Sequence, residues 1–384
     1  MKIVVVCDVL GKINNGTSMA AYNLISYLKD CGHNVKVICP DLDKLGEKDF
    51  FIVKKRSIPI VNKIYKKNGV VMGKPDREIL EAALKDADRV HILLPFVVGR
   101  AAIKICEKNN IPLSISFHCQ AENVTTHLGM QNIGFINNTI YRGFYRKAFK
   151  HVNVIHYPTK FIKDTFERIV GPTNGVVISN GVSDTFKPIT ANKPISMQKK
   201  FVLLSIGRLC GEKQHMVTLK AIQKSKYKNQ IQLIFIGNGP LNKQISNYAT
   251  KHLLPNQLIS YTAILKKEEI LEIINYSDLF IHPASIELEG IAVLEAIVCG
   301  LVPIVSNSKK AATKNFSLSE HTIFQVFDHN DLAKKIDYLL ENEALRMSLR
   351  TQYIEFGKQF YRSLCMQKME QMIVNMDSTT SVIK

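Results

Sequence analysis

Two glutamates eight residues apart are the side chains of this sequence best placed to do chemistry. Glu287 and Glu295 lie in residues 281–306, which read IHPASIELEGIAVLEAIVCGLVPIVS. Two short apolar runs frame this stretch, apolar residues at helical spacing lie between them, and Gly300 with Pro303 marks the end of the helix. The pattern predicts a strand, a loop with carboxylates at a helix entrance, the helix and a second strand. In open parallel sheets, ligands bind at the carboxyl ends of strands beside helix N-termini.

Glu295 is the residue that argues against a surface loop with solvated acids. It lies between Leu294 and Ala296, and no other charge follows in the run through Cys299. A lone buried carboxylate is costly unless something binds it. We therefore interpret this stretch as a ligand site.

Arg208 and Lys213 flank the turn that follows a predicted strand at 201–206. Taken alone, they are equally well explained as two surface cations. They would also suit a leaving diphosphate, which needs cations and helix N–H groups where negative charge develops. The next predicted strand, 231–236, ends in the turn G-N-G-P at 237–240.

The first half of the chain offers a histidine and a glycine at similar places. A predicted strand at 112–117 delivers His118 at its carboxyl end, where an ordinary hydrogen-bonded loop histidine is the alternative. Another strand, 2–9, leads to a turn at Gly16 and a helix at 17–28. Glycine at such a turn lets the backbone approach a ligand closely, although a plain strand-to-helix turn explains it equally well. No G-x-G-x-x-G follows the strand, so the dinucleotide-binding fingerprint is absent.

Strand and helix patterns alternate along the whole chain and restart after a polar linker at about 188–200. A chain of 384 residues is too long for one ordinary core and comfortable for two α/β domains. We expect two Rossmann-like domains with doubly wound parallel sheets, at 1–187 and 188–360, followed by a helical tail at 361–384. The first ten residues predict a buried strand rather than a signal peptide, and the eight scattered cysteines suit a reduced, cytosolic protein.

The net charge of +18 is the strongest compositional feature, and it is unevenly spread. Residues 51–150 hold 17 Lys and Arg against 7 Asp and Glu, which gives +10 of the +18. Such an excess suits nucleic acid, anionic lipid or anionic small molecules. No run of eighteen apolar residues indicates a membrane span.

Residues 136–150, INNTIYRGFYRKAFK, predict a basic helix with a largely aromatic face. Such a helix fits a membrane surface, and the lysines at 54, 55, 63, 66 and 67 would add to the attraction. The alternative is a helix that packs its aromatic residues on the core. No nucleic-acid-binding motif appears, and aromatic residues on the apolar side could not stack on bases, so a basic nucleic-acid-binding protein is a remote alternative.

The spacing E-x7-E, with the second glutamate inside L-E-A and C-G-x-x-P-I after it, resembles the signature of the family 4 retaining glycosyltransferases of the GT-B fold. The chain is most similar to the bacterial members that glucosylate cholesterol or diacylglycerol, on stretches that include NGTSM at 15–19 and the residues at 117–122 and 302–313. The resemblance implies a GT-B fold, in which two Rossmann-like domains face a central cleft and the C-terminal helix crosses back to the first domain. Asp41-Leu42-Asp43 forms a DxD, the metal motif of the other major glycosyltransferase fold, but it lies in a charged loop after an early strand. We expect neither a metal nor a cofactor.

The resemblance also implies a role for each candidate site residue. Glu287 would approach the donor sugar, and Glu295 would hold the ribose hydroxyls of the nucleotide. Gly290, Ile291 and Ala292 would present backbone N–H groups to the sugar and diphosphate. Arg208, Lys213 and Gly16 would bind the diphosphate, Gly237 matches the family's G-x-G-P turn, Ala263 and Ile264 would hold the base, and His118 would reach the sugar near its C6 hydroxyl.

The activity implied is the transfer of glucose from UDP-glucose to the hydroxyl of a membrane lipid, a sterol or diacylglycerol, as an α-glucoside. The partners would be the nucleotide sugar, the lipid and an anionic membrane surface met by the basic first domain, with no nucleic acid. The protein would then be cytoplasmic and peripheral on the inner face of the bacterial membrane. A soluble sugar, an envelope polysaccharide or a carrier remains the alternative acceptor.

Overall fold

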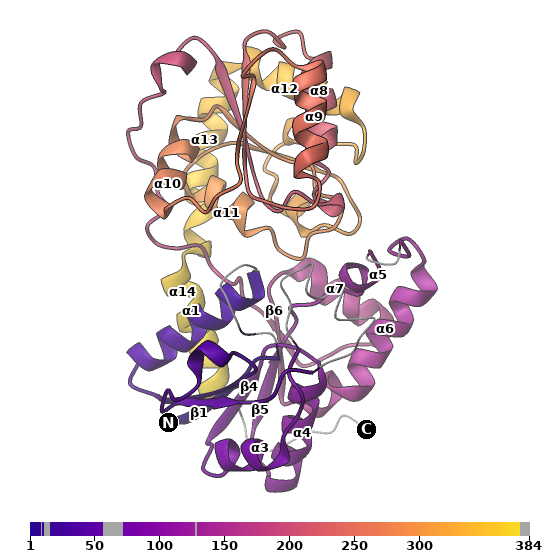
Figure 1. Ribbon diagram of the computed structural model, residues 1–384, viewed down its shortest axis with the longest axis vertical. Coiled ribbons are helices and arrows are strands. Elements are labelled where there is room, and N and C mark those ends of the chain that lie inside the picture. Colours follow the sequence, from indigo (N-terminus) through magenta and orange to yellow (C-terminus); the bar gives the residue numbers. More distant parts are fainter. Residues whose placement is uncertain (9, 11–15, 57–71, 127–128, 377–384) are drawn as a thin grey trace. The chain divides into compact units, whose positions relative to one another are not determined.

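The computed structural model describes residues 1–8, 10, 16–56, 72–126 and 129–376. Figure 1 shows that the chain divides into two compact units. The first unit comprises Met1–Asn180 together with the described residues from Leu364 onward, and the second comprises Gly181–Ser363. The lysines at 63, 66 and 67 lie outside the described residues.

The described part of the first unit contains a seven-stranded parallel sheet in the order β3-β2-β1-β4-β5-β6-β7. The strand order reverses between β1 and β4, which is where doubly wound sheets bind ligands. Continuous runs of Val, Ile and Leu form the central strands because helices cover both faces of such a sheet. The strands are β1 (Lys2–Val6), β2 (Asn34–Cys39), β3 (Phe50–Ile52), β4 (Arg89–Ile92), β5 (Leu113–Ser116), β6 (Val154–Tyr157) and β7 (Gly175–Val177). The helices are α1 (Gly16–Asp30), α3 (Arg77–Leu84), α4 (Val97–Asn109), α5 (Ala121–Thr125), α6 (Gly134–Lys147), α7 (Lys160–Val170) and α14 (Arg362–Val374).

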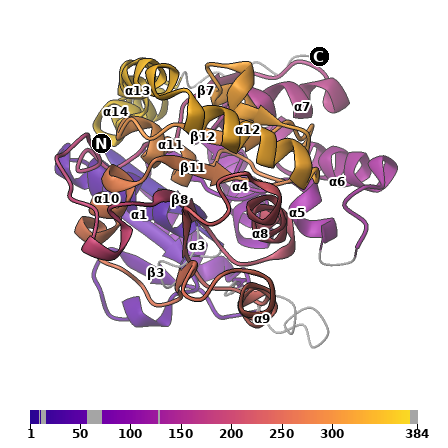
Figure 2. The same ribbon diagram turned by 90° about the horizontal axis from the view of Figure 1, so that it is seen from above.

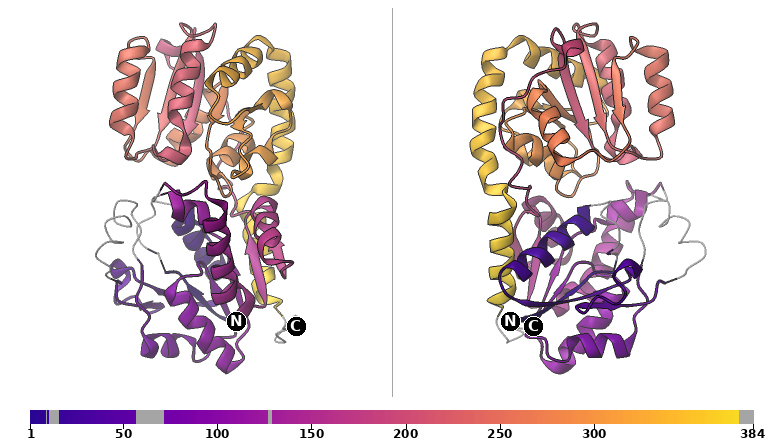
Figure 3. Two further views of the ribbon diagram at one scale, coloured as in Figure 1. Left: turned by 90° about the vertical axis from the view of Figure 1, so that its right-hand side faces the viewer. Right: turned by 60° about the vertical axis from the view of Figure 1, so that its left-hand side comes forward.

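Helix α14, at the end of the chain, completes the core of the first unit. Its residues Cys365, Met366, Met369 and Ile373 are buried in one cluster with α1 and strands β1 and β2. Figure 3 shows α14, in yellow, at an angle to α1, in indigo. The C-terminal helix therefore returns to the first unit, as expected for a GT-B fold.

The second unit contains a six-stranded parallel sheet, among the described residues, in the order β10-β9-β8-β11-β12-β13. Strands β8, β11 and β12 are neighbours near its middle (Figure 2). Helices α8, α9 and α12 lie on one side of the sheet, and α10, α11 and α13 lie on the other (Figure 1). The strands are β8 (Phe201–Ile206), β9 (Ile231–Ile236), β10 (Leu258–Tyr261), β11 (Leu279–His282), β12 (Pro303–Ser306) and β13 (Ile323–Phe324). The helices are α8 (His215–Lys224), α9 (Asn242–His252), α10 (Lys267–Tyr276), α11 (Ile291–Val298), α12 (His329–Glu341) and α13 (Glu343–Gly357).

These two units confirm the prediction of two Rossmann-like domains with doubly wound parallel sheets. The strand–loop–helix–strand order predicted for 281–306 is present as β11, α11 and β12. Because β8 and β11 pair in parallel, the loops that follow them leave the same edge of the sheet. The loop after β8 carries the predicted cations, and the loop after β11 carries Glu287.

Candidate active site

The centre of the candidate site is the Glu287 carboxylate in the loop between β11 and α11. Its Oε2 atom accepts a hydrogen bond from the Lys213 ammonium and another from Nε2 of His282, at 3.1 Å. Lys213 belongs to the 3-10 turn η5 (Gly211–Lys213) after β8, and His282 is the last residue of β11. All three side chains are at most about a fifth exposed. The structure thus brings together two predicted site residues and a histidine to which the sequence analysis gave no role.

Glu287 is held in its charged form by these two neighbours. Burial by itself would raise the pKa of Glu287, but the charge of Lys213 and the hydrogen bond from His282 lower it to about 2. Burial lowers the pKa of His282, although its bond to Glu287 opposes that effect. At neutral pH the group is therefore a carboxylate, an ammonium and a neutral imidazole.

Backbone hydrogen bonds join the two loops that carry Glu287 and Lys213. The Ser285 N–H donates to the Glu212 carbonyl oxygen at 2.8 Å, and the Ser285 hydroxyl donates to the same oxygen at 3.2 Å. On the other side, the Glu287 N–H donates to the Lys310 carbonyl at 3.1 Å, and the Ala312 N–H donates to the Glu287 carbonyl at 2.8 Å. The carboxylate is therefore fixed from loops that follow β8, β11 and β12.

Gly290 ends the loop and precedes the first turn of α11. Its φ of 90° lies in the left-handed region, which glycine adopts without strain. A Cβ atom added there would lie 2.5 Å from Cγ2 of Thr313. The sharp turn directs the start of α11, with Ile291 and Ala292 in its first turn, toward the carboxyl edge of the sheet.

We expect the substitution Gly290→Ala to destabilise the second unit by roughly 1–3 kcal/mol, because it adds both backbone strain and a steric clash. The double substitution Gly290→Ala with Thr313→Ser removes the opposing methyl group and should recover the steric part of that loss. Urea unfolding of the three proteins measures both effects. Equal stability of Gly290→Ala and the wild type would contradict this account of the turn.

Arg208 lies on the same loop as Lys213 but contacts a different carboxylate. Its Nη2 atom donates to Oε1 of Glu212 at 2.8 Å, and its side chain is nearly half exposed. Gly237 packs against this loop, since a Cβ atom there would lie 2.1 Å from the Gly207 carbonyl oxygen. Gly237 therefore lets the loops after β8 and β9 approach each other closely.

Glu295 lies on α11 and is partly buried. Burial raises its pKa to about 7, while Lys267 and Arg362 oppose the shift. The influence of these two cations could not be predicted from the residues around Glu295, because Lys267 and Arg362 lie in distant parts of the sequence. Ala263 and Ile264 follow β10 and are exposed, Ile264 almost completely.

In the first unit, His118 lies two residues beyond the end of β5. Its ring is edge-on to that of His156, with 5.8 Å between the centroids. Burial, with a smaller contribution from His156, lowers the pKa of His118 to about 3. His118 is therefore neutral at physiological pH. Gly16, the other predicted site residue of this unit, is exposed at the start of α1.

Beneath His118, a chain of hydrogen bonds crosses β4, β5 and β6. His156 Nε2 donates to the Ile178 carbonyl oxygen at 2.7 Å, because a carbonyl can only accept. His156 Nδ1 then accepts from the Ser116 hydroxyl at 2.7 Å, and Ser116 accepts from His91 Nε2 at 2.9 Å. His91 Nδ1 accepts from the Ser114 hydroxyl at 2.8 Å. Burial lowers the pKa of both histidines, so the chain is neutral and each tautomer is determined.

The aromatic face of α6 packs on the core of the first unit. Tyr141 is buried, the Phe144 ring lies 6.4 Å from that of Phe96, and the Tyr145 ring lies 6.2 Å from that of Phe166. Of the two interpretations of residues 136–150, core packing is therefore the one that applies to the aromatic residues. The basic residues of the helix remain on its exposed side.

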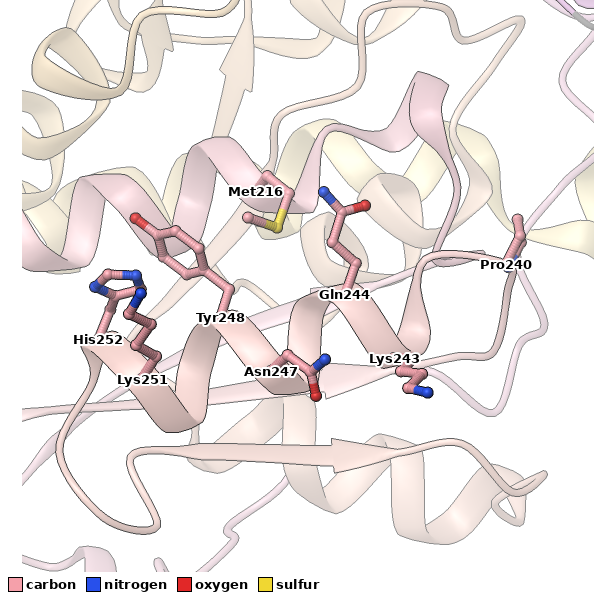
Figure 4. A pocket seen from close by; sticks show the side chains of 8 residues that line it. All are labelled: Met216, Pro240, Lys243, Gln244, Asn247, Tyr248, Lys251 and His252. Atoms are coloured by element: carbon pink, nitrogen blue, oxygen red, sulfur yellow. The ribbon is translucent and has the colours of Figure 1, made fainter.

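A pocket of about 550 Å³ lies along α9, and no residue of the Glu287 loop lines it (Figure 4). The pocket residues are Met216, Pro240, Lys243, Gln244, Asn247, Tyr248, Lys251 and His252.

Among the described residues, no group of three or more His, Cys, Asp or Glu side chains is arranged to hold a metal ion. Asp41 of the DxD caps a 3-10 turn and accepts a hydrogen bond from the Tyr22 hydroxyl at 3.2 Å. No described helix has the length and apolar character needed to span a bilayer.

Comparison with known proteins identifies the class. Residues 14–186 match the family described as Glycosyltransferase Family 4, and residues 187–360 match the one described as Glycosyl transferases group 1. The two matches adjoin and cover both sheets of the structure. The chain belongs to the family 4 glycosyltransferases of the GT-B fold, which confirms the resemblance drawn from the E-x7-E stretch.

The chain is also similar to individual proteins. The α-monoglucosyldiacylglycerol synthase of Acholeplasma laidlawii is 23% identical over 79% of this chain and 80% of its own length. The structure of Anabaena HepE in complex with UDP and glucose is 15% identical and has a TM-score of 0.73, over 98% of this chain and 100% of its own. The catalytic domain of cholesterol-α-glucosyltransferase from Helicobacter pylori is 35% identical over 41% of this chain and 97% of its own, with a TM-score of 0.37.

Proposed function

We propose that this glycosyltransferase moves glucose from UDP-glucose to the hydroxyl of a membrane lipid, a sterol or diacylglycerol, with retention at the anomeric carbon. The observation that carries the proposal is the Glu287 group, in which a charged carboxylate in the loop before α11 accepts hydrogen bonds from a loop ammonium and a strand histidine. The lipid acceptor is supported by the similarity to α-monoglucosyldiacylglycerol synthase. The nucleotide is supported by HepE, a protein of the same fold that binds UDP and glucose.

The donor would lie along the carboxyl edge of the second unit's sheet. In this proposal the uracil contacts Ala263 and Ile264, and the ribose hydroxyls donate to Glu295. The sugar contacts Glu287 and the N–H groups of the first turn of α11. The diphosphate takes Arg208 and Lys213 as its cations, and the turns at Gly237 and Gly16 would present backbone to it.

The chemical step needs no carboxylate nucleophile. The bond between the sugar C1 and the donor phosphate oxygen breaks, and the acceptor oxygen forms a new bond to C1 on the same face. The acceptor proton passes to the leaving phosphate oxygen, while Arg208 and Lys213 stabilise the charge that develops there. Neutral His118 would act as a hydrogen-bonding group at the sugar, since its lowered pKa makes it a poor source of protons. In this scheme neither a metal ion nor a cofactor takes part.

Membrane contact would come from the first unit. Arg142, Arg146 and Lys147 are exposed on α6, and Ile133 and Phe135 at its start are 46% and 77% exposed. Cations near anionic lipid contribute roughly 1 kcal/mol each, and exposed apolar residues beside them can enter the interface. We therefore propose that the protein is peripheral on the inner face of the bacterial membrane.

Donor binding should depend on the ionisation of Glu295. Its pKa is raised to about 7 by burial, and the carboxylate accepts from the two ribose hydroxyls more strongly than the protonated acid does. The dissociation constant of UDP-glucose should therefore rise as the pH falls below 7, by at most about tenfold per pH unit. Calorimetric titration from pH 5 to 8 measures this, and UDP-glucose is the right ligand because its phosphates do not titrate in this range.

The substitution Glu295→Gln supplies the control for that titration. It should weaken binding at pH 8 and remove the dependence on pH. An unchanged pH profile in Glu295→Gln would place the titrating group elsewhere.

The test of the proposed function is transfer from labelled UDP-glucose to liposomes that contain diacylglycerol or cholesterol, with EDTA throughout. A labelled lipid product supports the donor, the acceptor class and independence of metal together. UDP binding without a lipid product would move the acceptor to a soluble sugar, an envelope polysaccharide or a carrier. Absence of UDP binding, with salt-sensitive binding to duplex DNA, would overturn the proposal in favour of a nucleic-acid-binding protein.

A further inference from the structure

His282 is nearly fully buried at the end of β11 and contacts the carboxylate on which the donor site depends. Its Nε2 lies 3.1 Å from Glu287 Oε2, the same oxygen that Lys213 contacts. Its ring is stacked parallel to that of Phe280, with an interplanar angle of 12°, and the backbone of β11 is paired with β12. The imidazole is therefore held by a strand in the middle of the sheet.

The two donors to Glu287 differ in what else they can do. Lys213 has a long, flexible side chain in a 3-10 turn, and its ammonium is one of the cations assigned to the diphosphate. His282 lies on a strand, its imidazole is neutral, and it has no assigned contact with the phosphates. When the diphosphate draws Lys213 away, Glu287 keeps only the hydrogen bond from His282 among these two.

We propose that His282 is a positioning residue that orients the Glu287 carboxylate toward the donor sugar, and that it does so alone once Lys213 has turned to the diphosphate. The proposal rests on the proposed function, since it takes the sugar contact of Glu287 and the phosphate contact of Lys213 from there. With one carboxylate oxygen fixed by His282, the other is directed to the sugar hydroxyls. A neutral imidazole that donates from Nε2 can fix this oxygen without adding a charge beside the reacting sugar.

His215 provides a comparison within the same unit. It is equally buried, and burial lowers its pKa to about 3. Its ring is edge-on to Phe235 at 4.9 Å, and within the described part of the chain its Nδ1 has no hydrogen-bond partner. Lys213 and His282 lie near enough to lower the pKa of His215 further, but no hydrogen bond among the described residues joins His215 to Glu287. Its loss should therefore affect stability and not the orientation of the carboxylate.

The experiment compares His282→Ala, His282→Gln, Glu287→Gln and the double variant His282→Ala/Glu287→Gln, with His215→Gln as the buried-histidine control. Rates of transfer from UDP-glucose and dissociation constants for UDP are measured for each. A misplaced group at a reacting centre lowers rates by up to about a hundredfold, so His282→Ala should lose about tenfold to a hundredfold in kcat. Its affinity for UDP should stay within about twofold of the wild type, because UDP carries no sugar for Glu287 to contact.

The glutamine and double variants separate positioning from a merely structural role. In His282→Gln the introduced amide N–H can donate to Glu287, so this variant should recover most of the lost kcat. The double variant should be no slower than Glu287→Gln, because His282 acts only through that carboxylate. His215→Gln should keep the wild-type kcat.

If the wild type binds UDP and transfers glucose, two results would overturn this inference without affecting the proposed function. One is a His282→Ala variant with the wild-type kcat. The other is a double variant whose loss equals the product of the two single losses. Absence of UDP binding and transfer in the wild type would instead refute the proposed function, and this inference with it.

Discussion

Replacement of His118 by alanine is expected to abolish transfer, with a loss in kcat of about a thousandfold, while the dissociation constant for UDP stays within about twofold. Apart from Gly16, the residues assigned to the donor nucleotide belong to the second unit, whereas His118 belongs to the first unit and is assigned to the sugar. Its ring is held edge-on to His156 and, because burial lowers its pKa to about 3, it is a neutral hydrogen-bonding group. Calorimetry with UDP and the liposome transfer assay measure the two quantities separately.

The pH profile and a second histidine sharpen this test. Since the neutral form of His118 predominates above pH 3, its ionisation should give no limb in the activity profile between pH 5 and 8. His151, a partly exposed histidine of the same unit that contacts Glu107 at 2.7 Å, is the control, and His151→Ala should keep the wild-type kcat. Full activity of His118→Ala would remove this residue from the site.

The local architecture of the site could be predicted from the sequence because each strand, loop and helix of the site is specified by neighbouring residues. The E-x7-E stretch contains its own strand, loop, helix and stop signals, and the structure has β11, α11 and β12 there. The left-handed turn at Gly290 follows from the glycine itself. Alternation of strands and helices with continuous apolar runs was enough to predict two doubly wound parallel sheets.

The pairings within the site could not be read from the sequence because they depend on strand order. Lys213 and Glu287 are 74 residues apart and meet only because β8 and β11 are neighbours in the sheet. His282 looks like one more strand residue until the loop folds Glu287 back onto it. The hydrogen-bond chain through His91 and His156 likewise requires β4, β5 and β6 to be adjacent.

For α6 the sequence left two interpretations open, and the reason is physical. An amphipathic helix presents the same pattern whether its aromatic face meets a bilayer or a protein core. The contacts of Phe144 and Tyr145 with core aromatic residues decide for the core. The membrane proposal therefore depends on the cations of this helix and on Ile133 and Phe135, which precede the aromatic face.

Replacement of Lys213 by alanine is expected to damage both chemistry and stability. It removes a cation from the leaving diphosphate, so kcat/KM should fall about a hundredfold to a thousandfold. It also leaves Glu287 buried without its ion-pair partner, and breaking a buried pair on one side costs about 3–5 kcal/mol. Transfer kinetics and urea unfolding at pH 7 measure the two losses.

The dependence of stability on pH gives this prediction a characteristic sign. In the wild type the pKa of Glu287 is lowered from 4.5 to about 2, so its contribution of about 3 kcal/mol is complete above pH 4.5 and is lost as the pH falls through 2. Without Lys213 only His282 opposes burial, and since burial is the largest single influence on this pKa we expect it to prevail and to raise the pKa of Glu287 above its ordinary value. The charged form should then destabilise the fold above that pKa. Relative to the wild type, Lys213→Ala should therefore be closer in stability at pH 5 than at pH 8.

Two further variants isolate the cause of that loss. The double variant Lys213→Ala/Glu287→Gln should recover most of the stability but none of the transfer, because it removes the unpaired charge and leaves the diphosphate without its cation. Lys226→Ala breaks an exposed ion pair with Glu341 in the same unit and should change stability far less, with transfer unaffected. If Lys213→Ala unfolded at the same urea concentration as Lys226→Ala at every pH, the buried pair would not be what holds Glu287. If it also retained wild-type kcat/KM, the diphosphate would have to be neutralised by Arg208 and the helix N–H groups without Lys213.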